Sequence, residues 1–218
     1  MPTIAMQQLI RPFYKKAVCV VKHFKCVAIL LLLPILCRAQ MQTMQLNYYI
    51  SHAGKKIGWM KVNANVTGNR KTIYLISEIK IRKLIYMRVI SKDSSSFENS
   101  TLLFASQYRT MNGNVSLNKQ TSRKGVTYEV VQGGKIKQMQ PAKITINLLS
   151  LYTQEPVGIR QVYCEMDERF ANITRTSDGG YKVYFKNGDS SCYFYDKGIC
   201  NRVIVRHTFY SAEIVLNP

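Results

Sequence analysis

The 218-residue chain carries 31 Lys and Arg residues against 12 Asp and Glu residues, which gives a formal net charge of +19. This length suits one domain with its own hydrophobic core, and no Pro-rich or Ser-rich linker divides the chain. Beyond residue 39 there is no apolar run of about 18 residues, so no membrane-spanning helix is expected there.

The N-terminal segment has the pattern of an export signal. Residues 1–25 contain basic residues and no acid, and the apolar run 26–37 follows. A basic leader, a hydrophobic stretch of about a dozen residues and a small residue at the cut, here Ala39, are typical of a secretory signal. We therefore predict a signal peptide over 1–39 and a single antiparallel β domain over 40–218, located in the periplasm, at the outer envelope or outside the cell. The alternative is an N-terminal anchor.

Removal of the signal would leave a strongly basic protein. Six of the 31 bases and none of the 12 acids lie in residues 1–39, so 25 bases remain against 12 acids, a net charge of +13. Such an excess favours contact with anionic surfaces.

The rest of the chain is composed mainly of short alternating runs separated by turn signals. Residues 71–91, for example, are rich in β-branched and aromatic side chains, which favour strands. Gly-containing pairs accept the positive φ angles that tight hairpin turns require. They occur at Gly54, Asn112-Gly113, Lys124-Gly125, Gly133-Gly134, Asp178-Gly179-Gly180, Asn187-Gly188 and Lys197-Gly198. This spacing predicts a mainly β protein, folded as an antiparallel meander.

One segment, "NLLSLYTQEP", breaks the alternation. Leu148, Leu149 and Tyr152 are spaced as on one helical face, Thr145 is placed to cap a helix, and Pro156 would stop it. A helix of about two turns is marginal alone and needs its apolar face buried against the sheet. We predict a short helix near 145–153; the alternative is one more strand, with a turn before Pro156.

The mature chain retains three cysteines. Counting back from the turn at Lys197-Gly198 places Tyr195 rather than Cys192 opposite Cys200, which disfavours a Cys192–Cys200 disulfide. The Cys-x7-Cys spacing of Cys192 and Cys200 is also unlike the paired short spacings of zinc sites, and we expect no metal and no cofactor.

Four segments carry a family resemblance: "GKKIGWMKV", "LLSLYTQEP", "VYCEMDERFANI" and "KNGDSSCYFYDKG". In this order they resemble a domain-of-unknown-function family of exported bacterial all-β proteins with an L-x-L-Y-x-x-E-P segment. The resemblance implies a single curved antiparallel sheet, a half-barrel or barrel-like fold, with the short helix packed against its concave side. It implies no reaction.

No catalytic motif stands out, and we expect no enzyme. The densest acid cluster contains Glu165, Asp167 and Glu168, and His207 lies on the last long run. Glu165 and Asp167 would share one face of a strand, so a small exported enzyme that uses them with His207 is the alternative. A pairing of Cys164 with His207 is conceivable, but a half-buried cysteine is the commoner case.

Basic residues gather in two places. Lys80, Arg82, Lys83 and Arg88 belong to one predicted hairpin, and Lys182 and Lys186 flank Tyr184 on another strand. Bases interleaved with aromatic residues can hold single-stranded nucleic acid, but an exported protein meets little of it. Anionic lipid or glycan surfaces suit that compartment better. The alternative is a charged surface that binds nothing in particular.

These patterns together favour a non-catalytic envelope or periplasmic protein that holds an apolar or anionic, lipid-like ligand in a concave sheet. The candidate lining residues are Trp59, Leu149 and Tyr152. We expect a monomer that does not span the membrane and does not bind nucleic acid.

Overall fold

The computed structural model describes residues 41–218 except 83–85, 140–142, 209 and 218. The predicted signal peptide, 1–39, lies outside the described residues. Within them, one antiparallel sheet has 14 strands in the order β8-β7-β6-β5-β4-β3-β2-β1-β14-β13-β12-β11-β10-β9. The strands are β1 (Gln42–His52), β2 (Lys55–Thr67), β3 (Arg70–Arg82), β4 (Tyr86–Glu98), β5 (Thr101–Met111), β6 (Asn114–Lys124), β7 (Thr127–Gln132), β8 (Lys135–Met139), β9 (Gln161–Cys164), β10 (Arg169–Arg175), β11 (Tyr181–Tyr184), β12 (Ser190–Asp196), β13 (Ile199–His207) and β14 (Tyr210–Leu216).

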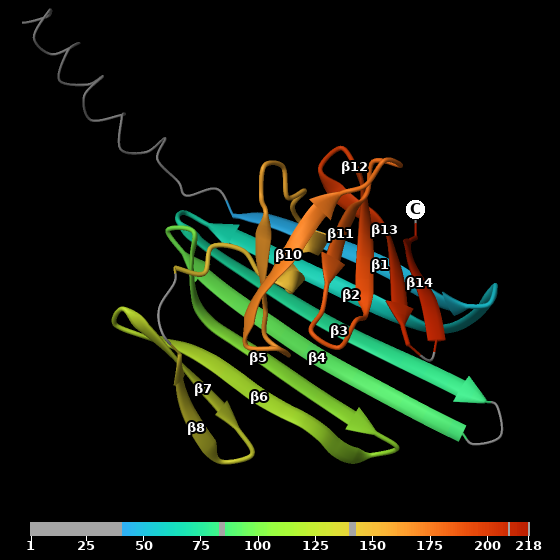
Figure 1. The fold of residues 1–218 in the computed structure, drawn as a ribbon, viewed down its shortest axis with the longest axis horizontal. Coiled ribbons are helices and arrows are strands. Elements are labelled where there is room, and N and C mark those ends of the chain that lie inside the picture. The colour runs from blue at the N-terminus through green and yellow to red at the C-terminus, as the bar shows by residue number, and fades with distance from the viewer. Residues whose placement is uncertain (1–40, 83–85, 140–142, 209, 218) are drawn as a thin grey trace, which may run out of the picture. The chain divides into compact units, whose positions relative to one another are not determined.

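This strand order confirms the predicted fold class. Two meanders, β1 to β8 and β9 to β14, are joined by pairing of the first strand with the last, Tyr48 opposite Leu216. The green strands β3 to β5 and the orange and red strands β10 to β14 face one another in Figure 1. Because β8 and β9 are the two ends of the order, the sheet is barrel-like but open.

The core lies on the concave face. On β1, Leu46, Tyr48 and Ile50 are buried and alternate with more exposed residues, and on β3 the same holds for Ile73 and Leu75. Side chains on a strand point alternately to opposite faces, so this period of two places one row of each strand in a shared core.

The short helix is the 3-10 helix η2 (Leu148–Tyr152), which packs against β3, β4, β9 and β13. Leu149, Leu151 and Tyr152 are buried, and the Tyr195 hydroxyl on β12 donates a hydrogen bond of 2.8 Å to the Leu151 carbonyl oxygen. The Tyr152 ring makes edge contacts with Tyr48 and Tyr193 on either side, at centroid distances of 5.7 and 6.0 Å. The prediction of a helix on the concave side is confirmed.

The predicted cap at Thr145 is wrong, and the cap is Asn147. The preceding residues are extended because their carbonyl groups are used by strands. Leu102 N at the start of β5 donates to Ile144 O at 2.8 Å, and Tyr163 N on β9 donates to Ile146 O at 3.1 Å. This segment therefore bridges the two meanders before the helix begins.

A buried lysine holds the same two parts together. Lys119 on β6 is only 4% exposed, and its Nζ donates to the carbonyl oxygens of Glu165 and Met166 at 3.3 and 3.1 Å. It also pairs with Glu168 Oε1 at 2.9 Å, while the exposed Lys137 on β8 pairs with the other carboxylate oxygen at 2.7 Å. The turn after β9 is thus fastened to β6 and β8.

The cysteines follow the predicted register. Tyr195 pairs with Cys200 across β12 and β13, and Cys164, Cys192 and Cys200 are free thiols. Burial raises the pKa of the Cys200 thiol to about 12. Within the described part of the chain, no helix has the length and apolar character needed to cross a membrane.

Leu151 and Leu149 provide a matched pair for measuring how η2 stabilises the fold. Leu151→Ala should lower the free energy of unfolding by about 2–5 kcal/mol, because the side chain is fully enclosed and its removal leaves a void. Leu149→Ala should cost less, because that side chain borders space that is already empty. Urea denaturation monitored by circular dichroism measures both, and equal losses would contradict the distinction.

Lys119 and Lys137 bind the same carboxylate from different environments. Lys119→Met should lower the free energy of unfolding by about 3 kcal/mol, because it leaves buried acceptors without a donor. Lys137→Met should cost less than about 1 kcal/mol, as is usual for exposed ion pairs. Urea midpoints of the two variants test this difference, and similar values would show that the buried lysine does not fasten the turn.

Candidate functional site

A cavity of about 470 Å³ lies on the concave side, between β4 and β5, η2, and the turns that follow β9, β11 and β13. Its size is within the range of pockets that bind small molecules. One part of the lining is apolar or aromatic: Leu75, Leu149, Tyr152, Phe185, Tyr193 and Val205. Another part is ionisable: Asp93, Arg109, Glu165, Asp167, Asp189 and His207.

The fully buried side chain of Asn147 organises the cavity wall. Its Nδ2 donates to Ser95 Oγ on β4 at 2.6 Å and to Glu165 Oε1 at 2.5 Å. Its Oδ1 accepts from the Ser150 backbone N at 3.0 Å and from Ser150 Oγ at 2.6 Å. One carboxamide therefore uses both donors and both acceptor positions, and joins a strand, a turn and the helix.

Glu165 is buried beside this amide. Burial raises the pKa of its carboxyl to about 7, and the nearby charge of Asp93 acts in the same direction. Its own backbone N–H, the Asn147 amide and the charge of Lys119 oppose the rise. A carboxyl in this state holds or releases a proton near neutral pH.

Asp93 points into the cavity from the inner face of β4, opposite Gln107 on β5. Burial raises the pKa of Asp93 to about 6, and the charge of Arg109 opposes this rise. Among the residues that the structure describes, none hydrogen-bonds the Asp93 carboxyl or forms an ion pair with it. Arg109 lies two pairs further along the ladder, opposite Ser91, and its Nε donates to Ser91 Oγ at 3.3 Å.

The other charged groups have partners within the protein. Asp189 Oδ1 accepts from Thr208 N and Thr208 Oγ1 at 3.0 and 3.2 Å, and Oδ2 lies 3.1 Å from His207 Nε2. Asp167 Oδ2 accepts from the Lys186 backbone N at 3.0 Å. These bonds fix the two turns that border the cavity.

Glu165 and Asp167 do not share a strand face as the sequence indicated. β9 ends at Cys164, and both acids lie in the following turn, where Lys119 holds the backbone. Burial raises the pKa of the Cys164 thiol to about 11, so it lacks the thiolate character of a nucleophile. Among the described residues, no group of three or more His, Cys, Asp or Glu side chains is arranged to hold a metal ion.

Of the predicted lining residues, Leu149 and Tyr152 line the cavity, whereas Trp59 does not. Trp59 lies on the outer face of β2, 41% exposed, and its Nε1 donates to Glu78 Oε2 at 3.2 Å. The alternation of the strand explains this, because the neighbouring Met60 takes the inward position.

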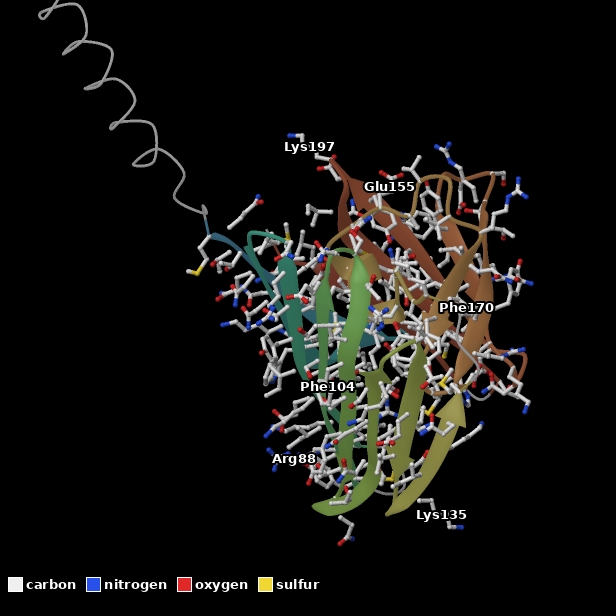
Figure 2. All side chains as sticks on the ribbon, turned by 90° about the vertical axis from the view of Figure 1, so that its left-hand side faces the viewer. Arg88, Phe104, Lys135, Glu155, Phe170 and Lys197 are labelled. Atoms are coloured by element: carbon white, nitrogen blue, oxygen red, sulfur yellow. The ribbon has the colours of Figure 1, made fainter. Side chains whose placement is uncertain are left out.

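The predicted basic residues that the structure describes lie outside the cavity. Lys80 and Arg88 pair with Glu78 at 3.2 and 2.6 Å, and Figure 2 shows Arg88 projecting from the sheet. The guanidinium of Arg82 lies 5.7 Å from the ring centroid of Tyr86.

The second basic group is less regular than predicted. Lys182 Nζ lies 4.8 Å from the ring centroid of Tyr184. Lys186 does not share its strand, because β11 ends at Tyr184 and Lys186 lies in the following turn. Lys83 lies outside the described residues.

Sequence reasoning missed Asp93, Arg109 and Asn147. The sequence did contain a signal for Asp93. It lies with Ser95 and Phe97 on the inward-facing side of β4, so it places a charged side chain on a buried face. Asn147 carries a local signal as a helix cap, since asparagine is favoured there and its side chain accepts from Ser150. Nothing local marks its bonds to Ser95 and Glu165, which lie 52 and 18 residues away.

The pKa of Glu165 predicts a pH-dependent stability. Between about pH 4.5 and 7 the folded carboxyl keeps a proton that the unfolded chain releases, so stability falls as pH rises through this window. Glu165→Gln should therefore match the native protein near pH 4.5 and exceed it by roughly 3 kcal/mol at pH 8. Urea unfolding at several pH values measures this, with the partly exposed Glu213→Gln as control; a difference independent of pH would contradict the prediction.

The comparisons with known proteins concern the fold and the family. A search of the curated proteins found no match. The crystal structure of a beta-barrel-like protein of domain of unknown function DUF1849 from Brucella abortus is similar, with a TM-score of 0.52 and 8% identity, over 83% of this chain and 97% of that chain. At this identity the likeness shows the fold alone. The family model for domain of unknown function DUF6134 matches residues 48–217, which run from within β1 to the penultimate residue of the chain. The chain belongs to the DUF6134 family.

Proposed function

We propose that this protein is an exported, non-catalytic envelope or periplasmic protein that holds a small amphipathic, lipid-like molecule in its concave cavity. The observation that carries the proposal is the cavity of about 470 Å³, which has an apolar and aromatic wall beside an ionisable one. Sites for small molecules commonly combine an apolar lining with a few convergent polar groups.

A binding role agrees better than catalysis with the state of the charged groups. A hydrolase or isomerase that uses Glu165, Asp167 and His207 would need reactive groups aimed at a substrate. Asp167 instead fixes the backbone of Lys186, and Asp189 fixes Thr208 and pairs with His207. Since these acids position turns, they support a preformed cavity rather than a catalytic set.

The cavity lining changes the expected ligand. Four carboxyl groups line it against Arg109 and His207, so a purely anionic molecule would meet more like charge than opposite charge. The basic excess of the chain lies instead on outer surfaces such as the β3–β4 hairpin, where Arg88 and Lys80 project. Those residues support contact of the outer face with an anionic lipid or glycan surface.

Native mass spectrometry of the detergent-free mature protein tests the cavity ligand. We expect a bound mass that organic extraction releases, and we expect Leu149→Trp, which fills the cavity, to lose it while remaining folded. A tryptophan at the exposed Val115 is the control and should keep the bound mass. A homogeneous ligand-free mass, with no lipid in the extract, would exclude the carrier role and leave a structural one.

A further inference from the structure

The cavity contains ionisable groups that form no ion pair with another described residue, and their charges indicate which ligand would suit it. Asp167 and Asp189 are held by backbone and side-chain donors, and His207 pairs with Asp189. Removing these from the set leaves two carboxyl groups, Asp93 and Glu165, and one guanidinium, Arg109. These remaining groups include both negative and positive charges.

The negative side of the set is Asp93 with Glu165. The Asn147 amide supplies one donor to Glu165, but among the described residues none donates to Asp93. A half-buried carboxylate is costly without hydrogen-bond donors. A ligand ammonium, with three N–H donors, would supply them to both carboxyl groups from one point in the cavity.

The positively charged group, Arg109, lies further along the sheet than Asp93. Asp93 pairs with Gln107 and Ser91 pairs with Arg109, so the two charged residues lie diagonally on one face, about 7 Å apart along the strand direction. The Nε of Arg109 is directed at Ser91, and none of the described residues accepts a hydrogen bond from its terminal nitrogens, which form a fork suited to a phosphate. Tyr152 and Tyr193 add aromatic lining, which favours an ammonium group and an apolar chain.

We propose that the cavity binds a phosphoethanolamine group, with its primary ammonium at Asp93 and Glu165 and its phosphate at Arg109. Asp93 and Arg109 stand on neighbouring strands two residue pairs apart, an arrangement that suits an ammonium and an anionic group joined through more than one carbon. The shared chemistry is found in a phospholipid headgroup and in the free zwitterion. This inference rests on the proposed function, because it names the polar end of the amphipathic ligand.

Isothermal titration calorimetry on the mature protein tests the proposal with four probes: lysophosphatidylethanolamine, lysophosphatidylglycerol, O-phosphoethanolamine and ethanolamine, each lipid below its micellar concentration. We expect lysophosphatidylethanolamine to bind at least tenfold more tightly than lysophosphatidylglycerol. If lysophosphatidylethanolamine binds at least tenfold more tightly than O-phosphoethanolamine, the natural ligand is a lipid. If the two affinities are similar, the ligand is the soluble zwitterion.

Two variants that each remove one charge test the two ends of the ligand separately. Asp93→Asn should abolish the preference for the amine, weakening lysophosphatidylethanolamine tenfold or more and leaving lysophosphatidylglycerol unchanged. Arg109→Gln should weaken both lipids, and ethanolamine should bind Arg109→Gln as it binds the native protein. Arg88→Gln, on the outer face, is the control and should change neither affinity. Thermal unfolding verifies that each variant is folded.

The failures of the two proposals are distinguishable. Equal binding of the two lipids, unaffected by Asp93→Asn, would overturn the phosphoethanolamine assignment while keeping a ligand in the cavity. Absence of binding by every probe, together with a ligand-free mass for the native protein, would overturn both.

Discussion

The fold depends on one buried amide that links elements which strand pairing leaves unconnected. Asn147 joins Ser95 on β4, Glu165 after β9 and Ser150 in η2, although these groups belong to separate parts of the chain. An unpaired amide in this position would be costly, so all of its partners must be present together. The resulting network fixes both the helix and the wall of the cavity.

This closure has a consequence for function. A barrel closed by strand pairing would bring the side chains of its edge strands together. Here a bridging segment joins β5 to β9, and the buried Lys119 joins β6 to the turn after β9. Because the junction is made by a few polar contacts, space remains between β4 and the turns, and ionisable groups border it. The contacts that join these elements therefore also shape the candidate site.

Charge is divided between the two faces of the molecule. Arg88 and Lys80 lie on the outer face, while Asp93, Glu165 and Asp189 border the cavity. The net charge of the whole chain reflects mainly the basic outer face, because that surface is larger. It has the opposite sign to the excess of carboxyl groups around the cavity. For this reason the ligand that we propose carries a positive charge as well as the negative charge that the composition suggested.

The sequence by itself determined the strands, their hairpins and the presence of one short helix, because alternation, Gly-containing turns and the spacing of Leu148, Leu149 and Tyr152 are local signals. It also determined the pairing of Tyr195 with Cys200, which follows from counting along one hairpin. Only the tertiary structure decided that the extended segment before Asn147 bridges two strands, that Trp59 points outward and that Asp93 and Glu165 line one cavity. These depend on contacts between residues far apart in the chain, and periodicity contains no information about which distant strands and turns meet.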